Sequence, residues 1–68
     1  MSLYVARIIT QNREGKKFTV GWLKSGKTVK RRKAARAYDS PSSAERAGEA
    51  YLKGHPLGHT MWLKVEPH

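Results

Sequence analysis

Cysteine is absent from this chain of 68 residues, and acidic residues are scarce. The lack of cysteine excludes a disulfide framework and any metal site built on thiolates, and it leaves the redox compartment undecided. The chain has only five Asp and Glu residues against fourteen Lys and Arg residues, which gives a formal net charge of +9. Such a charge on a short chain implies an anionic partner, which could be DNA, RNA, an acidic protein surface or anionic lipid.

Long apolar segments are also absent. No stretch approaches the roughly 20 apolar residues needed to span a bilayer. The opening residues, MSLYVARIIT, lack the basic start, long apolar core and small-residue cleavage site of a signal peptide. We therefore expect no membrane partner, and we expect a location in the cytoplasm of a bacterial or phage-infected cell. The length predicts one domain, residues 1–68, with a single thin core.

Two segments in the first third of the chain have the composition of β-strands. The first, residues 3–10 (LYVARIIT), is rich in β-branched and apolar residues. The second, residues 17–23 (KFTVGWL), alternates, and its period places Phe18, Val20 and Trp22 on one buried face. Trp22 is thus expected in the core.

A hairpin turn is expected at residues 24–27 (KSGK), because Gly26 adopts positive φ at little energetic cost. A third strand is expected to begin at Thr28 and to extend toward Tyr38. In that strand the basic residues share a face with apolar ones. Either the tip of the hairpin projects beyond the core, or a bulge near Arg32 exchanges the two faces.

A helix is expected to begin at Ser40-Pro41, because Ser40 can cap free backbone amides and proline suits the first helical position. Gly54 ends it. One slim apolar stripe at helical spacing consists of Ala44, Ala47, Gly48 and Tyr51. Residues 60–66 (TMWLKVE) alternate as a last strand. The order β-β-β-α-β predicts an α+β fold, in which one helix packs on one face of a single small antiparallel or mixed sheet.

Two short motifs resemble ligand sites but lack the necessary context. Residues 21–28 (GWLKSGKT) match a phosphate-binding loop, yet no helix begins at their end, and Trp22 and Leu23 are bulky where the loop must wrap tightly. His55 and His59 have the spacing of two metal ligands on a helix, but a proline and a glycine lie between them. A zinc site also needs three or four ligands. We expect neither a cofactor nor a metal.

The few acids do not suggest catalysis. Glu45 and Glu49 are most simply exposed helix residues that balance Arg46 and Lys53. No histidine lies near Ser42 in the sequence, so a nucleophile activated by a neighbouring base is not indicated. We expect no catalytic residues, no enzymatic activity and no small-molecule substrate.

The basic segment at residues 24–36 (KSGKTVKRRKAAR) holds seven of the fourteen Lys and Arg residues and no acid. Concentrated positive charge on a small domain is typical of nucleic-acid binding. The candidate residues for binding nucleic acid or another anionic partner are Lys24, Lys27, Lys30, Arg31, Arg32, Lys33 and Arg36.

Alternation also places Trp62 on the side of the last strand opposite Met61 and Leu63. There it either stacks on bases, holds a protein partner or covers the sheet edge.

Two parts of the chain carry a resemblance to a known family. They are the hairpin KFTVGWLKSGKTVKRRK and the junction Tyr38-Asp39-Ser40, which leads to Ala44, Ala47 and Tyr51. This part of the chain resembles the arm-type DNA-binding domain of tyrosine recombinases (phage integrases), in which a three-stranded sheet on one helix enters the major groove. The resemblance implies that Thr19, Lys30, Arg32 and Arg36 face the DNA. Two features differ: these 68 residues contain no catalytic domain, and a fourth strand is expected after the helix. With that strand the chain is similar to small bacteriophage proteins that bind and disable host enzymes.

The sequence thus predicts a non-enzymatic nucleic-acid-binding protein that uses a basic β-hairpin. Double-stranded DNA is favoured over RNA, with low sequence specificity, because few Asn or Gln residues accompany the cations. The alternative is a phage-type inhibitor or adaptor that docks on an acidic host protein. A third alternative is a ribosomal or RNA-associated protein.

Overall fold

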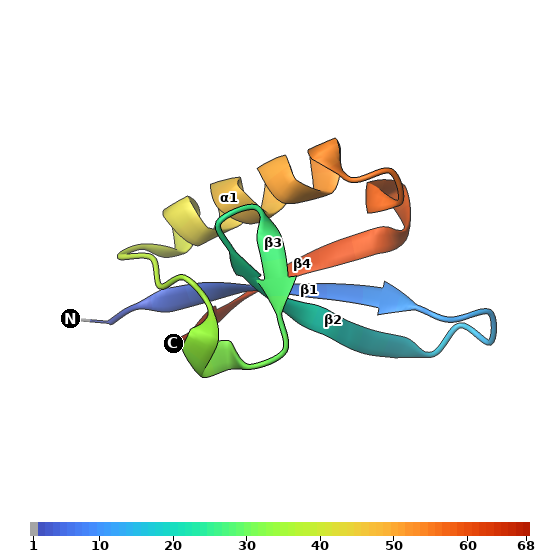
Figure 1. Ribbon diagram of the computed structural model, residues 1–68, viewed down its shortest axis with the longest axis horizontal. Helices are drawn as coiled ribbons and strands as arrows, with labels where there is room; N and C mark the ends of the chain where they lie inside the picture. Colours follow the sequence, from blue (N-terminus) through green and yellow to red (C-terminus); the bar gives the residue numbers. More distant parts are fainter. Residues whose placement is uncertain (1) are drawn as a thin grey trace.

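A computed structural model describes residues 2–68 as a four-stranded antiparallel sheet with one helix on one face (Figure 1). The strand order is β3-β2-β1-β4, and the order along the chain is β-β-β-α-β, so the predicted fold class is confirmed. The strands are β1 (Tyr4–Gln11), β2 (Lys17–Lys24), β3 (Lys27–Val29) and β4 (Met61–Pro67). The helix is α1 (Pro41–Gly54), and two short 3₁₀ turns are η1 (Arg32–Ala34) and η2 (Gly58–Thr60).

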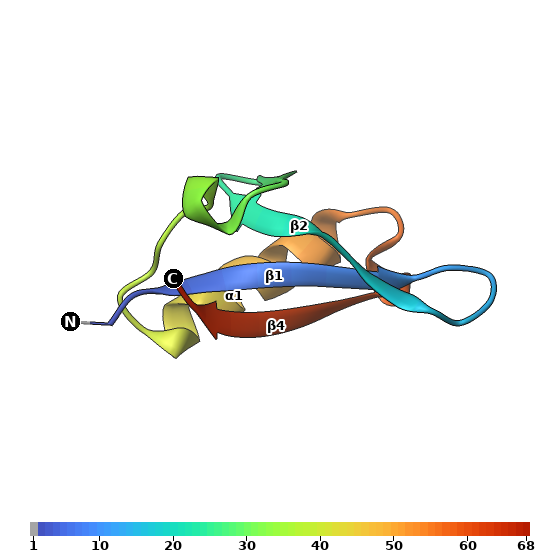
Figure 2. The same cartoon turned by 90° about the horizontal axis from the view of Figure 1, so that it is seen from below.

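The central strand β1 lies between β2 and β4 and supplies much of the core (Figure 2). Its Val5, Ala6 and Ile8 are fully buried. Ile8 pairs with Leu63 of β4, which lies against α1, so Ala6 and Ile8 face the helix. Val5 points to the opposite side of the sheet, which we call the open face.

Helix α1 begins as the sequence predicts. The Ser40 side chain caps its start by accepting a hydrogen bond from the backbone N–H of Ser43 at 3.2 Å. Of its predicted apolar stripe, Ala44 and Gly48 are buried, while Ala47 and Tyr51 are half-buried. A Cβ placed at Gly48 would overlap the methyl groups of Leu63. The absence of a side chain there is what lets the helix approach β4 closely.

A β-bulge in β2 overturns the predicted face of that strand. Ile8 pairs with Gly21 and Ile9 pairs with Thr19, so Val20 has no partner across the pair. The extra residue breaks the period of two and puts Phe18 and Trp22 on opposite faces of the sheet. Phe18 is 49% exposed, so the predicted buried face of Phe18, Val20 and Trp22 is wrong. Trp22 pairs with Arg7 and lies on the open face instead.

The hairpin turn between β2 and β3 is confirmed. Both central residues have positive φ, 46° at Ser25 and 83° at Gly26, as a two-residue type I′ turn requires. The backbone of β3 also lies very close to β2. A Cβ at Gly21 of β2 would lie 2.7 Å from the carbonyl oxygen of Val29 in β3. Glycine at this position permits the close approach of β3 to β2 beside their last pair, Trp22 and Val29.

The third strand is much shorter than predicted. It ends at Val29, and the chain bends into η1. The predicted extension to Tyr38 is therefore wrong, and so is a strand bulge near Arg32, whereas residues 24–27 at the hairpin tip are exposed. The four consecutive cations of residues 30–33 offer no apolar side chain for a buried face, and all four are exposed. The chain rejoins the sheet only at Tyr38, whose backbone N–H and carbonyl exchange hydrogen bonds of 2.7 and 2.8 Å with Tyr4.

Candidate nucleic-acid interface

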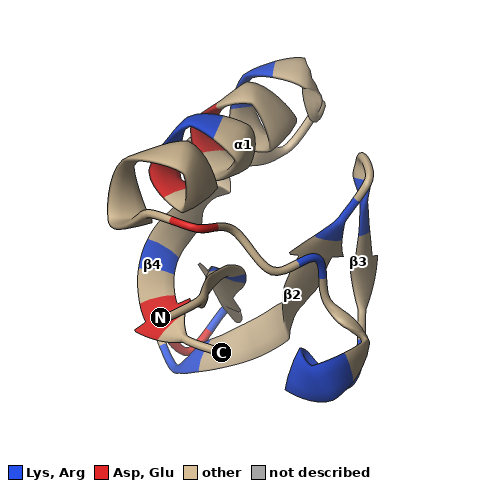
Figure 3. Cartoon of the chain, turned by 90° about the vertical axis from the view of Figure 1, so that its left-hand side faces the viewer, with Lys and Arg blue, Asp and Glu red and all other residues tan. Residues whose placement is uncertain are grey.

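Six of the seven predicted binding residues lie on β3 and the turns at its two ends. Arg36 lies on the other side of β2, where its backbone N–H donates to the Leu23 carbonyl at 3.1 Å, and we call all seven the basic edge. Lys24 and Lys27 flank the hairpin turn, residues 30–33 form the bend and η1, and Arg36 follows in extended chain. All seven are exposed. Figure 3 shows blue Lys and Arg positions at β3 and the turn after it, whereas blue and red positions are mixed on α1 and β4.

The positive charge of the basic edge is not neutralised from within the molecule. Between residues 2 and 68, the single ion pair joins Arg7 to Glu66, and neither belongs to the basic edge. Glu45 and Glu49 are exposed on α1. The guanidinium of Arg36 lies 5.4 Å from the ring centre of Tyr38, which is a contact with an aromatic ring and not with an acid. The chain therefore has one strongly positive region, while acids and cations balance each other on α1.

The basic edge has two ends rather than one tip. Its hairpin end borders a hollow shared with α1, lined in part by Gly26 and Tyr51. Its η1 end borders a different hollow, lined by Arg32, Lys33 and His68. The predicted basic β-hairpin is therefore correct for Lys24 and Lys27 and wrong for the other five, which follow the hairpin because β3 stops early.

Of the four residues that the integrase resemblance places against DNA, Lys30 and Arg32 lie close in the turn after β3, whereas Arg36 borders hollows shared with α1. Lys30, Arg32 and Arg36 belong to the basic edge. Thr19 lies apart, on the open face, where its hydroxyl accepts a 2.6 Å hydrogen bond from Nε of Arg7. Thr19 is thus engaged inside the molecule.

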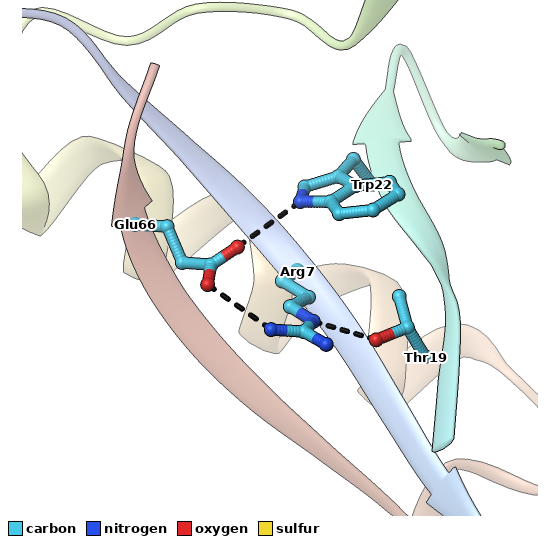
Figure 4. A network of polar contacts seen from close by, with 4 residues as sticks. All are labelled: Arg7, Thr19, Trp22 and Glu66. Atoms are coloured by element: carbon cyan, nitrogen blue, oxygen red, sulfur yellow. Dashed lines mark hydrogen bonds and ion pairs between the residues drawn. The ribbon is translucent and has the colours of Figure 1, made fainter. Parts of the chain in front are cut away.

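A polar network on the open face joins three strands (Figure 4). Arg7 Nη1 of β1 lies 3.1 Å from Glu66 Oε2 of β4. The indole N–H of Trp22 in β2 donates to the other carboxylate oxygen of Glu66, also at 3.1 Å. The guanidinium of Arg7 lies 5.8 Å from the ring centre of Trp22. Sequence reasoning missed this network. Its only signal in the sequence was that Arg7 alternates with Ala6 and Ile8 along β1, which puts Arg7 on the open face.

The network lowers the pKa of Glu66. Desolvation is the largest single influence and raises the pKa of the Glu66 carboxyl, whose side chain is only 14% exposed. The hydrogen bonds from Trp22 and Arg7, together with the charges of Arg7 and Lys64, outweigh it, so the pKa lies below the ordinary value of 4.5. The carboxylate is therefore ionised and satisfied at neutral pH.

Replacing the Glu66 carboxylate should make the free energy of unfolding less dependent on pH in the acidic range. A depressed folded-state pKa means that Glu66 stabilises the fold above its unfolded pKa, and that this contribution is lost as the pH falls below about 4.5. We expect Glu66→Gln to lower the free energy of unfolding by about 1–2 kcal/mol at pH 7, since a charge-assisted hydrogen bond and a partly exposed ion pair are weakened. Urea unfolding from pH 7 to pH 3 measures both effects.

The matched control is Glu49→Gln, which alters an exposed helix carboxylate without an ion-pair partner in residues 2–68. We expect it to change the free energy of unfolding by less than about 0.5 kcal/mol. Equal losses for Glu66→Gln and Glu49→Gln would show that the network does not stabilise the fold.

Trp62 lies on the open face, as its parity predicts, and it is 42% exposed. It pairs with Ile9 of β1, while Leu63, its neighbour, faces α1. The ammonium of Lys17 lies 5.0 Å from the centre of its ring. An exposed indole next to a cation suits contact with bases, which is one of the predicted roles.

The remaining candidates occupy the loop after α1. His55 Nδ1 accepts a hydrogen bond from the backbone N–H of Leu57 at 3.0 Å, and the His55 ring lies 5.6 Å from that of Tyr51. His59 lies in η2. Within residues 2–68, no three His, Asp or Glu side chains come together in a way that could hold a metal ion. Over the same range, no helix has the length and apolar character needed to cross a membrane.

Comparison with known proteins adds no relative. Neither a protein-family model, nor a curated protein, nor a solved structure matches this chain. The chain's own charges and side chains are therefore what indicate its function.

Proposed function

We propose that this chain is a small non-enzymatic nucleic-acid-binding protein that holds double-stranded DNA through its phosphates, with low sequence specificity. One observation carries the proposal: seven exposed cations gather around β3 and the end of β2, and none forms an ion pair within residues 2–68. Unpaired, clustered Lys and Arg side chains attract a polyanion, and release of its counterions supplies the affinity.

The shape of the basic edge supports contact with several phosphates. The three residues of β3 separate its hairpin end from its η1 end by roughly 10 Å, at about 3.3 Å per residue. Duplex DNA carries a charge for about every 1.7 Å of its axis, so both ends can reach phosphates at once. The basic edge contains no Asn or Gln that could read a base. We place this activity in the cytoplasm of a bacterial or phage-infected cell.

Salt dependence tests the proposal directly. If about five cations of the basic edge touch phosphates, the logarithm of the affinity should fall with the logarithm of salt concentration at a slope of roughly −4 to −5. Fluorescence anisotropy of a labelled random 20-bp duplex (length chosen to exceed the protein), titrated at several NaCl concentrations, measures the slope. A second duplex of unrelated sequence should bind equally well.

Three outcomes would contradict the proposal. A slope near zero would mean that phosphates are not the ligand. Preference for single-stranded RNA over duplex DNA by more than about tenfold would favour the RNA-associated alternative. Weak duplex binding together with a stable complex of one acidic host protein would favour the inhibitor or adaptor.

A further inference from the structure

The open face of the sheet has a hollow at the end away from η1. The hollow has a volume of about 430 Å³ and is lined by Gln11, Asn12, Arg13, His59, Thr60 and Trp62. Because β4 runs from Met61 to Pro67, Trp62 lies at its start, whereas His68, which borders the η1 hollow, lies beyond its end. The basic edge and this hollow are therefore separate surfaces.

The polar groups of the hollow fall into two sets. Asn12 and Thr60 serve the local fold: Asn12 Oδ1 accepts hydrogen bonds from two backbone amides at 2.9 and 3.0 Å, and the Thr60 hydroxyl donates to the Leu57 carbonyl at 2.7 Å. Within residues 2–68, the side chains of Gln11, Arg13 and His59 make no hydrogen bond, and all three are exposed. An amide, a guanidinium and an imidazole are therefore available beside an exposed indole.

This combination suits an unpaired nucleobase. Bases stack on aromatic rings, and their edges present donors and acceptors that an amide or an imidazole can meet. In the protein without nucleic acid, the ammonium of Lys17 lies 5.0 Å from the centre of the Trp62 ring. Contact between an exposed ring and a lysine is weaker than base stacking, so a base can take the place of Lys17. The released ammonium is then free to pair with a phosphate.

We propose that this hollow binds an unpaired base, stacked on Trp62, while Arg13 and Lys17 neutralise the adjoining phosphates. The proposal rests on the function proposed above and narrows its ligand. The preferred nucleic acid is a duplex with a single-stranded extension, in which the basic edge holds the duplex and the open face receives the extension.

The surface between the two sites permits this path. On β4 the open face presents Trp62, Lys64 and Glu66, spaced by about 6.6 Å for each pair of residues. Lys64 is exposed and positive. Glu66 does not repel phosphates strongly, because Arg7 and the indole of Trp22 engage its two oxygens. The path from His68 to Trp62 is thus about 20 Å long. An extension of about five nucleotides, comparable to the smallest sites of single-strand-binding folds, covers it.

The test compares a blunt duplex with the same duplex carrying a five-thymidine tail on its 3′ or 5′ end, and with a tail of five abasic sites as a charge-matched control. For the unaltered protein, we expect a thymidine tail to raise the affinity about tenfold or more, since one stacked base contributes that much. The abasic tail should add no more than its extra phosphates do. The thymidine tail should also quench tryptophan fluorescence.

Substitution of Trp62 separates stacking from charge. Trp62→Ala should lose the gain from the thymidine tail while binding the blunt duplex unchanged, because Trp62 lies outside the basic edge. Trp62→Phe should keep part of the gain but lose the quenching, since only Trp22 then fluoresces. Both variants should keep the circular dichroism spectrum, because the side chain is 42% exposed.

The outcomes distinguish the two proposals. If the blunt duplex binds with the expected salt slope but the thymidine tail adds nothing beyond the abasic tail, the unpaired-base site is refuted and the proposed function stands. A gain that persists in Trp62→Ala would likewise refute the site. If no duplex binds, with or without a tail, both proposals fail.

Discussion

Reversing the charge of Arg31 and Arg32 to Glu should weaken binding to blunt duplex DNA by at least about 100-fold at physiological salt. Both residues are exposed in and beside η1, and neither makes an ion pair or a side-chain hydrogen bond within residues 2–68. Each substitution removes a phosphate contact and adds a repulsive charge. The salt slope should therefore become shallower by about 2, one unit for each lost contact. Anisotropy with the random duplex measures both quantities.

A control with the same change in net charge tests whether location matters. Lys16→Glu with Lys53→Glu reverses two exposed cations, one in the turn after β1 and one on α1, outside the basic edge. If binding depends on the basic edge, this control should lose less than about tenfold, because screening weakens charges beyond a Debye length of about 8–10 Å. Equal losses would mean that only net charge matters, and that the basic edge is not a binding site.

Circular dichroism and thermal unfolding complete the comparison. The side chains of Arg31 and Arg32 have no partner in residues 2–68 that the fold depends on, so both double variants should fold. Unfolding of the Arg31→Glu, Arg32→Glu protein would instead show that these cations are structural.

The elements that the sequence predicted well depend on local signals. Ser40 caps α1 through a backbone N–H only three residues away, and Pro41 occupies the first helical position. The turn at Ser25-Gly26 requires only its own positive φ values. The basic edge was also predictable, because its seven cations lie within thirteen consecutive residues.

The features that the sequence could not predict depend on contacts between distant segments. The bulge at Val20 is defined by how β2 meets β1, and without it Trp22 would share a face with Phe18. Arg7 and Glu66 are 59 residues apart and meet only because β4 returns to pair with β1. The basic edge is divided into a hairpin end and an η1 end because β3 stops at Val29. The alternation of apolar and polar residues in the sequence did not indicate this early end.

Adding a single methyl group at Gly48 should give the largest loss of stability among glycine-to-alanine substitutions in α1. The new Cβ would overlap both methyl groups of Leu63, so the helix must move away from β4 or Leu63 must leave its rotamer. Overpacking of this kind costs about 1–3 kcal/mol, which exceeds the gain of up to about 1 kcal/mol from helix propensity. For a domain of this size, each lost kcal/mol lowers the melting temperature by about 4–8 °C.

Gly54→Ala is the matched control, because Gly54 is also helical and nothing lies within 4 Å of its would-be Cβ. It should leave the melting temperature unchanged or raise it. A double-mutant cycle with Leu63→Ala then identifies the cause. If the overlap with Leu63 is responsible, the variant with both substitutions should be more stable, by at least about 0.5 kcal/mol, than the sum of the single losses. Additive losses, or equal effects of Gly48→Ala and Gly54→Ala, would show that close packing of α1 on β4 does not limit stability.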